Sequence, residues 1–399
     1  MQHSSFSRSP VPGKGTATIY ADNAATTPLS PAALEAMLPW MTRRWGNPSS
    51  PHAVGQDAAK ALLESRETMA GLLGCRAREL TFTSGGSEAD NQALLSAADW
   101  GKARGTRHIV SSAFEHSAVL RTLDYLRFQG FEITLLRPTP EGYLMPEQVA
   151  EALREDTCLV SVMLANNEIG TIQPIPEIGA LCRKRGILFH TDAVQGVGHI
   201  PLEISRLNVD MLSLSAHKFH GPMGMGALYV RQGVTPLPLI RGGGQERGAR
   251  AGTENVPGAV GMSAALREAC ARMEETTAAT ACLRDRLAGG LSVIPGSIPV
   301  GGAGPRLPGV LTVCFEGVEA EALLLLLDGA GICASSGSAC SSGALEPSHV
   351  LRSMGLPLPL VKSAVRFSLS AENTEEEIDI IAAATARFVA RLRDRQKEA

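Results

Sequence analysis

Two short apolar runs that each end in chemically reactive side chains constrain the fold of this chain most strongly. Residues 186–189 lead into His190-Thr191-Asp192, and residues 209–214 lead into Ser215-Ala216-His217-Lys218. Similar runs at 80–83, 109–111 and 159–164 alternate with helix-like stretches such as 88–102 and 177–185. Strands that are apolar throughout and separated by helices predict a mostly parallel sheet buried on both faces. Ligands bind beyond the carboxyl ends of such strands, so an α/β fold should bring Asp192 and Lys218 to one edge.

The pair of Asp192 and Lys218 indicates a pyridoxal phosphate (PLP) site. Taken alone, Lys218 could be a surface lysine with chance neighbours, and Asp192 could be a helix N-cap. Taken together they supply what PLP requires, which is an amine to hold its aldehyde and a carboxylate to keep its pyridine nitrogen protonated. The sequence therefore predicts PLP as the cofactor.

The length of 399 residues exceeds the usual size of one hydrophobic core and predicts two domains. We expect a flexible lead-in over residues 1–18 and a large cofactor-binding domain over 19–258, whose first residues join the small domain. A smaller α+β domain over 259–399 follows. It should hold a long helix at 260–286, strands at 299–302 and 310–315, and a terminal helix at 375–397.

Composition excludes several classes of protein. A net charge of −3 provides no basic footprint for nucleic acid. No apolar stretch is long enough to span a membrane, and the first 18 residues lack the apolar region of a secretory signal. The eight cysteines form neither a CxxC pair nor a regular spacing, which argues against a disulfide framework or a zinc site. We therefore expect a cytoplasmic protein without a bound metal.

Further polar residues follow the other predicted strands of the first domain. Gly86 and Ser87 lie in a glycine turn that opens a helix, which suits either a phosphate site or a simple helix cap. His116 could stack over the cofactor ring and move protons, although a lone histidine is more often structural. Asn167 could donate to the cofactor or to a substrate carboxylate, or it could be an Asx-turn residue.

Two features of the second domain carry chemistry. Cys340 lies in a run of small residues, 334–343, that is either a flexible surface connection or a mobile loop carrying a nucleophilic thiol. Arg366 lies in an alternating strand, 363–368, where its guanidinium could bind an amino-acid carboxylate or could face solvent at a sheet edge.

These motifs resemble the cysteine desulfurases of the NifS/IscS type, which are PLP enzymes of fold type I in the class V aminotransferase family. The similarity runs in order from residue 20 to residue 369. It includes the segments at 20–27, 46–50, 115–116, 166–170, 192–195, 215–218 and 242–246, besides the cysteine run and Arg366. So many motifs in one order are far more specific than any single motif.

The resemblance implies a role for each candidate residue. Lys218 would bind the cofactor covalently, Asp192 would pair with the pyridine nitrogen, and Gln195 would contact the phenolic oxygen. The remaining roles concern stacking, the phosphate and the substrate: His116 over the ring; Gly86, Ser87, Ser215 and His217 at the phosphate; Thr253 at the phosphate of a neighbouring subunit; Asn167 and Arg366 at the substrate carboxylate. The reach of Thr253 implies a homodimer.

The activity that the resemblance implies is conversion of L-cysteine to L-alanine, with the sulfur held on Cys340 as a persulfide. A sulfur-acceptor protein, such as an iron–sulfur scaffold or a thiolation protein, would then receive it. Gly86-Ser87 departs from the Ala-Thr of many IscS-type members, and the acceptor stays open. A related aminotransferase, or a sulfur-relay protein without catalysis, are the alternatives; Cys340 argues against the first, and Lys218 with Asp192 against the second.

Overall fold

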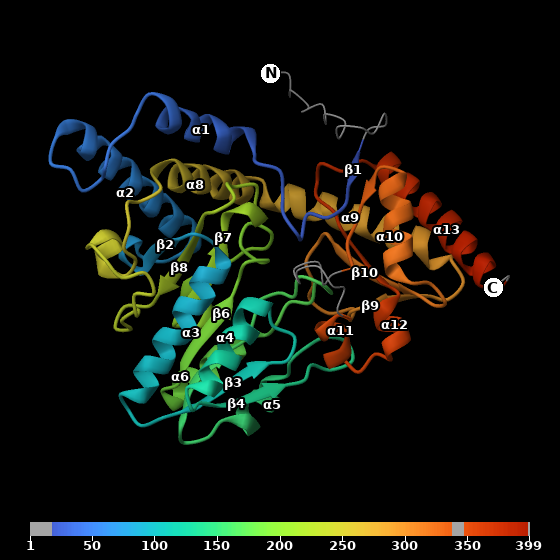
Figure 1. The fold of residues 1–399 in the computed structure, drawn as a ribbon, viewed down its shortest axis with the longest axis horizontal. Coiled ribbons are helices and arrows are strands. Elements are labelled where there is room, and N and C mark those ends of the chain that lie inside the picture. Colours follow the sequence, from blue (N-terminus) through green and yellow to red (C-terminus); the bar gives the residue numbers. More distant parts are fainter. Residues whose placement is uncertain (1–17, 337–346, 398–399) are drawn as a thin grey trace.

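A seven-stranded sheet forms the centre of the computed structural model, which describes residues 18–336 and 347–397 (Figure 1). In spatial order the strands are β2 (Leu80–Thr83), β8 (Gly226–Val230), β7 (Met211–Ser215), β6 (Leu188–Asp192), β5 (Thr157–Ser161), β3 (His108–Ser112) and β4 (Glu132–Leu136). The strands from β7 to β4 pair in parallel, and β8 pairs antiparallel with both of its neighbours. Every strand except the edge strand β4 is buried along its whole length, which confirms the predicted α/β fold.

Alternation along these strands divides the core of the sheet into two faces. Leu188 and Met211 pack with α3 (Gly86–Lys102) and α4 (Ser117–Phe128) on one face. Phe189 and Leu212 pack on the other face, in a cluster that draws on α2 (Ala53–Leu73), α6 (Ile175–Arg185) and α8 (Val256–Ala271). The shorter helices of this part of the chain are α1 (Pro31–Thr42), α5 (Pro146–Ala152), α7 (Ile204–Leu207), η1 (Ala77–Glu79), η2 (Ala216–Lys218) and η3 (Gln245–Gly248).

A second, antiparallel sheet forms a separate core. Its spatial order is β12 (Ala364–Ser368), β10 (Val310–Phe315) and β9 (Ser297–Val300). Apolar residues of α9 (Met273–Ser292), α10 (Ala320–Gly329) and α13 (Glu375–Lys397) share a cluster with this sheet. The strand β1 (Ile19–Tyr20) pairs with β11 (Ile332–Cys333), so the start of the described chain lies against this second core (Figure 1). Two short helices complete the fold, α11 (His349–Ser353) and α12 (Leu358–Lys362).

The predicted single helix over residues 260–286 is wrong. The chain forms two helices, α8 and α9, that meet at Arg272, whose backbone angles are φ −108° and ψ 5°. The physical reason is that each helix serves a different core: α8 packs against α1 and α2, whereas α9 packs against α13. The predicted division of the chain between residues 258 and 259 falls within the first turn of α8. That division stays a prediction.

None of the helices within the described ranges is both long and apolar enough to cross a membrane.

Candidate cofactor and substrate site

The carboxyl ends of β6 and β7 bring the two leading candidates to one edge of the large sheet. Asp192 is the last residue of β6 and pairs in register with Ser213 of β7. Lys218 follows β7 directly, at the end of η2. Asp192 is buried, and its Oδ1 accepts a hydrogen bond from the Val194 backbone N–H at 2.9 Å. Burial raises the pKa of Asp192, while the positive charges of His116 and Lys218 oppose that shift.

The segment between β1 and α1 lies against both the lysine and its neighbours. Lys218 Nζ donates to the Ala24 carbonyl at 2.7 Å and to the Ala25 carbonyl at 2.8 Å. Gln195 Nε2 donates to the same Ala24 carbonyl at 2.9 Å. Sequence reasoning assigned no role to these two carbonyls. The sequence signal that points to them is the motif at residues 20–27, to which both residues belong.

The glycine turn before α3 approaches the same edge very closely. A Cβ atom on Gly86 would lie 2.6 Å from Val194 Cγ2 and 3.6 Å from Ser215 Cβ, so in this chain a side chain there would require Val194 to shift. The turn that carries Gly86, the turn after Asp192 and the end of β7 therefore meet at one point. Gly86 is the first residue of α3, whose free N–H groups and dipole favour an anion. Ser87, the next residue, is exposed.

Two predicted histidines lie at this edge. His217 Nδ1 is 3.1 Å from Thr26 Oγ1, and burial, with the nearby charge of Lys218, lowers the pKa of His217 to about 4. Its ring is therefore neutral at pH 7. His116 caps α4, because its Nδ1 accepts from the Ala118 N–H at 3.1 Å. A ring nitrogen of His116 lies within 4.8 Å of a carboxylate oxygen of Asp192.

Arg366 and Asn167 also come together. The Arg366 side chain is 3% exposed, and its Nη2 pairs with Asp22 Oδ1 at 2.7 Å. Its Nη1 donates to the Asn167 carbonyl at 2.9 Å. Within the described residues its Nε is buried without a hydrogen bond. The guanidinium thus lies inside the protein, not on a surface edge, and its Nε–H is not used by these two contacts.

Two predicted residues are not part of this cluster. Thr253 is exposed between η3 and α8, and within the described chain no hydrogen bond joins it to the other candidates. Cys340 lies outside the described residues.

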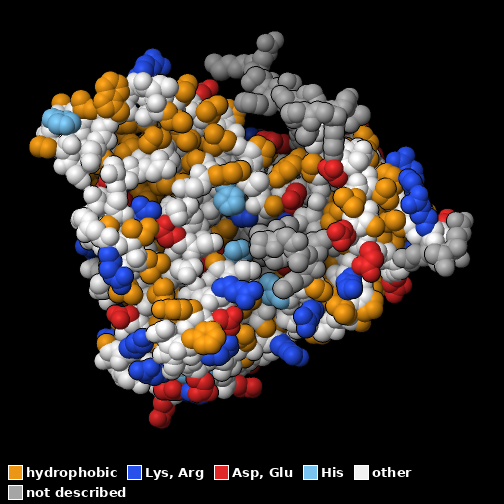
Figure 2. Space-filling view, viewed as in Figure 1, with side chains coloured by type: hydrophobic (Ala, Val, Ile, Leu, Met, Phe, Trp, Pro, Cys, Tyr) orange, Lys and Arg blue, Asp and Glu red, His pale blue; other side chains and the backbone are white. Residues whose placement is uncertain are grey.

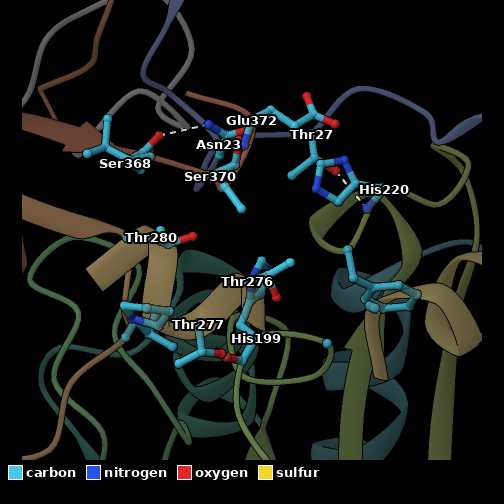
Figure 3. A pocket seen from close by; sticks show the side chains of 18 of the residues that line it. Asn23, Thr27, His199, His220, Thr276, Thr277, Thr280, Ser368, Ser370 and Glu372 are labelled. Carbon is cyan, nitrogen blue, oxygen red and sulfur yellow. Dashed lines mark hydrogen bonds between the residues drawn. The ribbon is translucent and has the colours of Figure 1, made fainter. Parts of the chain in front are cut away.

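A cavity of about 160 Å³ lies beside the cluster, at the junction of the two cores. Figure 3 shows Asn23 and Thr27 of the N-terminal segment, His199, and the α9 residues Thr276 and Thr277 among its lining side chains. Ala24 and Gln195 border this cavity, but Lys218, Asp192 and His116 do not. The convergence of reactive groups, and not the size of a cavity, therefore locates the chemistry at the ends of β6 and β7.

A reactive lysine beside a buried carboxylate, facing a helix N-terminus that suits a phosphate, defines the class of protein. It is the arrangement of a PLP-dependent transferase of fold type I.

Comparison with known proteins agrees with this class. The chain belongs to the aminotransferase class-V family, which matches residues 19–381. A cysteine desulfurase IscS of Methanosarcina thermophila is 48% identical over 376 residues, which cover 94% of this chain and 93% of that protein. Among solved structures, a NifS-like protein aligns with a TM-score of 0.88 and 38% identity, over 94% of this chain and 99% of that one. A structure titled SspA in complex with cysteine aligns with a TM-score of 0.77 and 35% identity, over 88% and 99%.

The residues present fit PLP. Gly86 lets the first turn of α3 lie directly against Val194 and Ser215, so the helix N-terminus reaches the edge that carries Asp192 and Lys218. Lys218 is held by two carbonyls that orient its amine, and the Asp192 carboxylate accepts a hydrogen bond from the Val194 N–H. These groups match the aldehyde, phosphate and ring nitrogen of PLP, the cofactor of this family.

We predict that Gly86→Ala weakens PLP retention by about tenfold, because overpacking a tight contact of this kind costs about 1–3 kcal/mol. The measurement is the PLP content per chain after dialysis at a series of PLP concentrations. Gly71→Ala is the matched control, because a Cβ on Gly71 in α2 meets no atom within 4 Å. Equal PLP retention by the two variants would contradict the placement of the phosphate at this turn.

Proposed function

We propose that this protein is a cysteine desulfurase that converts L-cysteine to L-alanine and transfers the sulfur to one of its own cysteines as a persulfide. One observation supports the amino-acid substrate most directly. Asp22 pairs with Arg366, while Ala24 and Ala25 of the same segment hold the Lys218 amine. The segment from Asp22 to Ala25 therefore contacts both the guanidinium of Arg366, which could bind a carboxylate, and the reactive amine of Lys218. The similarity to proteins named cysteine desulfurase supports cysteine as that amino acid.

Each side chain of the cluster has a proposed role toward PLP. Lys218 would bind PLP covalently, Asp192 would pair with its ring nitrogen, and Gln195 would contact its phenolic oxygen. The groups proposed for stacking and for the phosphate are His116 over the ring, and Gly86, Ser87, Ser215 and His217 around the phosphate. Asn167 and Arg366 would hold the substrate carboxylate, for which Arg366 Nε has an unused donor.

The reaction balances without any outside oxidant. PLP, when bound, supplies an electron sink for charge that develops at the substrate Cα. Lys218 Nζ would take the Cα proton, and the thiolate of Cys340 would attack the substrate sulfur. The C–S bond breaks as an S–S bond forms, and protons returned to the carbon skeleton complete alanine. The enzyme thiol and cysteine thus become an enzyme persulfide and alanine.

We predict that Lys218→Ala abolishes alanine formation, because the amine that the Ala24 and Ala25 carbonyls hold at this position is lost. Cys340→Ala should retain bound PLP but form no persulfide and lose at least 100-fold in alanine production, as expected for loss of a nucleophile. Cys282→Ala, at an exposed cysteine on α9, should behave like the parent. The measurements are alanine release and mass spectrometry of the peptide that contains residue 340.

Several outcomes would contradict this function. Parent-level alanine from Cys340→Ala would exclude that thiol as the nucleophile, and a keto acid product would indicate an aminotransferase instead. Parent-level turnover by Lys218→Ala would remove the proposed role of the lysine.

We also propose that the protein is a homodimer. Large apolar side chains of α1, α2 and the connection between them are exposed, among them Leu38 at 48%, Met41 at 63% and Trp45 at 72%. Figure 2 shows apolar side chains gathered over the end of the molecule where Figure 1 places α1 and α2. An apolar surface of this kind usually marks an interface. A second copy there would also give the exposed Thr253 its proposed role at the neighbouring phosphate.

The destination of the sulfur and the compartment are further parts of the proposal. We propose a cytoplasmic enzyme that delivers sulfur to an acceptor protein for iron–sulfur cluster assembly or another thiolation. The similarity to IscS proteins supports the first destination.

We predict that the double variant Met41→Asp with Trp45→Asp is a monomer, because burying two carboxylates in an apolar interface is unfavourable. Sedimentation velocity of the parent and the variant, both loaded with PLP, measures the change. Phe128→Asp is the control, since Phe128 is 88% exposed at the end of α4, away from the proposed interface. A parent that sediments as a monomer, or a double variant that remains a dimer, would contradict this interface.

A further inference from the structure

A second buried carboxyl group lies beside Asp192, on the helix whose first turn faces the proposed phosphate. Asp90 is four residues after Gly86 on α3, and residues spaced by four share a helix face. The Asp90 side chain is 1% exposed. A carboxylate oxygen of Asp90 lies within 4.8 Å of one of Asp192. Helix α3 therefore carries a carboxyl group to the proposed pyridine partner as well as a turn for the phosphate.

The surroundings of Asp90 contain hydrogen-bonding groups, and a ring nitrogen of His116 lies within 4.8 Å of one of its carboxylate oxygens, as it does for Asp192. Its Oδ1 lies 3.6 Å from His190 Nε2 and has no hydrogen bond within the described residues. His190 is fully buried between two hydroxyl groups, with Nδ1 2.9 Å from Ser161 Oγ and Nε2 3.0 Å from Ser213 Oγ. Burial lowers the pKa of His190 to about 3, so this ring is neutral at pH 7 and does not compensate a charge on Asp90.

Two buried carboxyl groups this close together do not both ionise, and the environment decides which one keeps the proton. Asp192 has the Val194 N–H donor, and the charges of His116 and Lys218 favour its ionised form. For Asp90, burial comes first and the negative charge of Asp192 second, and both raise its pKa well above the usual value. The hydrogen bond of Ser213 opposes the rise, and the charge of Glu115 adds to it.

We propose that Asp90 is a positioning residue for the cofactor: a protonated carboxyl group that holds Asp192 in place and leaves the negative charge on Asp192. The inference rests on the proposed role of Asp192 and goes beyond it. Asp90 and His190 are then polar neighbours of Asp192 that carry no charge. The full attraction between Asp192 and a protonated ring nitrogen is then available to bind PLP. Partners of this kind behind a direct ligand typically change affinity about 10–100-fold when removed.

The first test uses the apo-protein and does not depend on catalysis. With aspartate labelled with ¹³C at its side-chain carboxyl carbon, infrared spectroscopy at pH 7 should show the C=O stretch of a protonated aspartate in the parent. That band should be missing in Asp90→Asn and present in Asp192→Asn. The label separates Asp90 from Glu115, a buried glutamate whose pKa burial raises to about 8. Absence of the band from the parent, or its persistence in Asp90→Asn, would overturn the inference.

The pH dependence of stability gives a second readout in the apo-protein. A carboxyl group whose pKa is raised on folding contributes stability that is complete below its unfolded pKa and is lost as pH rises toward the folded pKa. Relative to Asp90→Asn, the parent should therefore lose stability as pH rises above about 4, the unfolded pKa of an aspartate, by up to about tenfold in the folded-to-unfolded ratio per pH unit. The titratable groups that face Asp90 are present in both proteins: Asp192, His190, Glu115 and His116. A pH-independent difference between the two proteins would contradict the protonated state.

The last test is made with PLP bound. Asp90→Asn keeps a neutral group of the same shape and should retain the dissociation constant of PLP and the pH profile of its visible absorbance within about twofold. Asp90→Ala should raise that dissociation constant by about tenfold or more. If Asp90→Asn loses as much PLP affinity as Asp90→Ala, the negative charge of Asp90 is needed and the inference is wrong. If Asp90→Ala binds PLP as tightly as the parent, Asp90 has no role in cofactor binding. If Asp90→Ala does not fold, the Asp90→Asn titration and the infrared band decide. Unchanged PLP binding in Asp192→Asn would instead refute the proposed role of Asp192.

Discussion

The parallel pairing of β6 with β7 is the interaction on which the rest of the site depends. Its register sets Asp192 opposite Ser213, so the chain that continues from β7 brings Ser215 and Lys218 beside the end of β6. A shift of β6 or β7 by one position would turn the side chain of Asp192 or of Ser215 to the other face of the sheet. Burial of both strands on both faces fixes that register, because Phe189 and Leu212 fill one core while Leu188 and Met211 fill the other. A packing constraint therefore determines the chemical geometry.

Charge around this edge is controlled mainly by burial. His190 and His217 are kept neutral by desolvation, so the cationic candidates near Asp192 are Lys218 and His116. The proposed protonation of Asp90 completes the same arrangement, in which a single carboxylate faces the ring-binding position. On the substrate side, Arg366 is neutralised by Asp22, whose chain neighbours hold Lys218. The segment from Asp22 to Ala25 thus connects the two halves of the proposed reaction.

The sequence predicted those features that residue type and strand position determine locally. The sheet, the placement of Asp192 and Lys218, and the terminal helix α13 are of this kind, because apolar runs and helix periodicity are local signals. The carbonyls of Ala24 and Ala25 were missed because a backbone group has no sequence signature. The contact between Asp22 and Arg366 joins residues 344 positions apart, and Asp90 gains its meaning only from the way α3 lies over the sheet. The break at Arg272 was missed because helical periodicity continues on both sides of it, while two separate cores determine the direction of each helix.

The identity of the lysine that carries PLP is the property on which the proposed site depends most directly. Borohydride reduction of the PLP-loaded protein, followed by proteolysis and mass spectrometry, locates the resulting pyridoxyl group on one peptide. The pyridoxyl group should be found on Lys218, next to the end of β7. A pyridoxyl group on another lysine, with Lys218 unmodified, would contradict the proposed site.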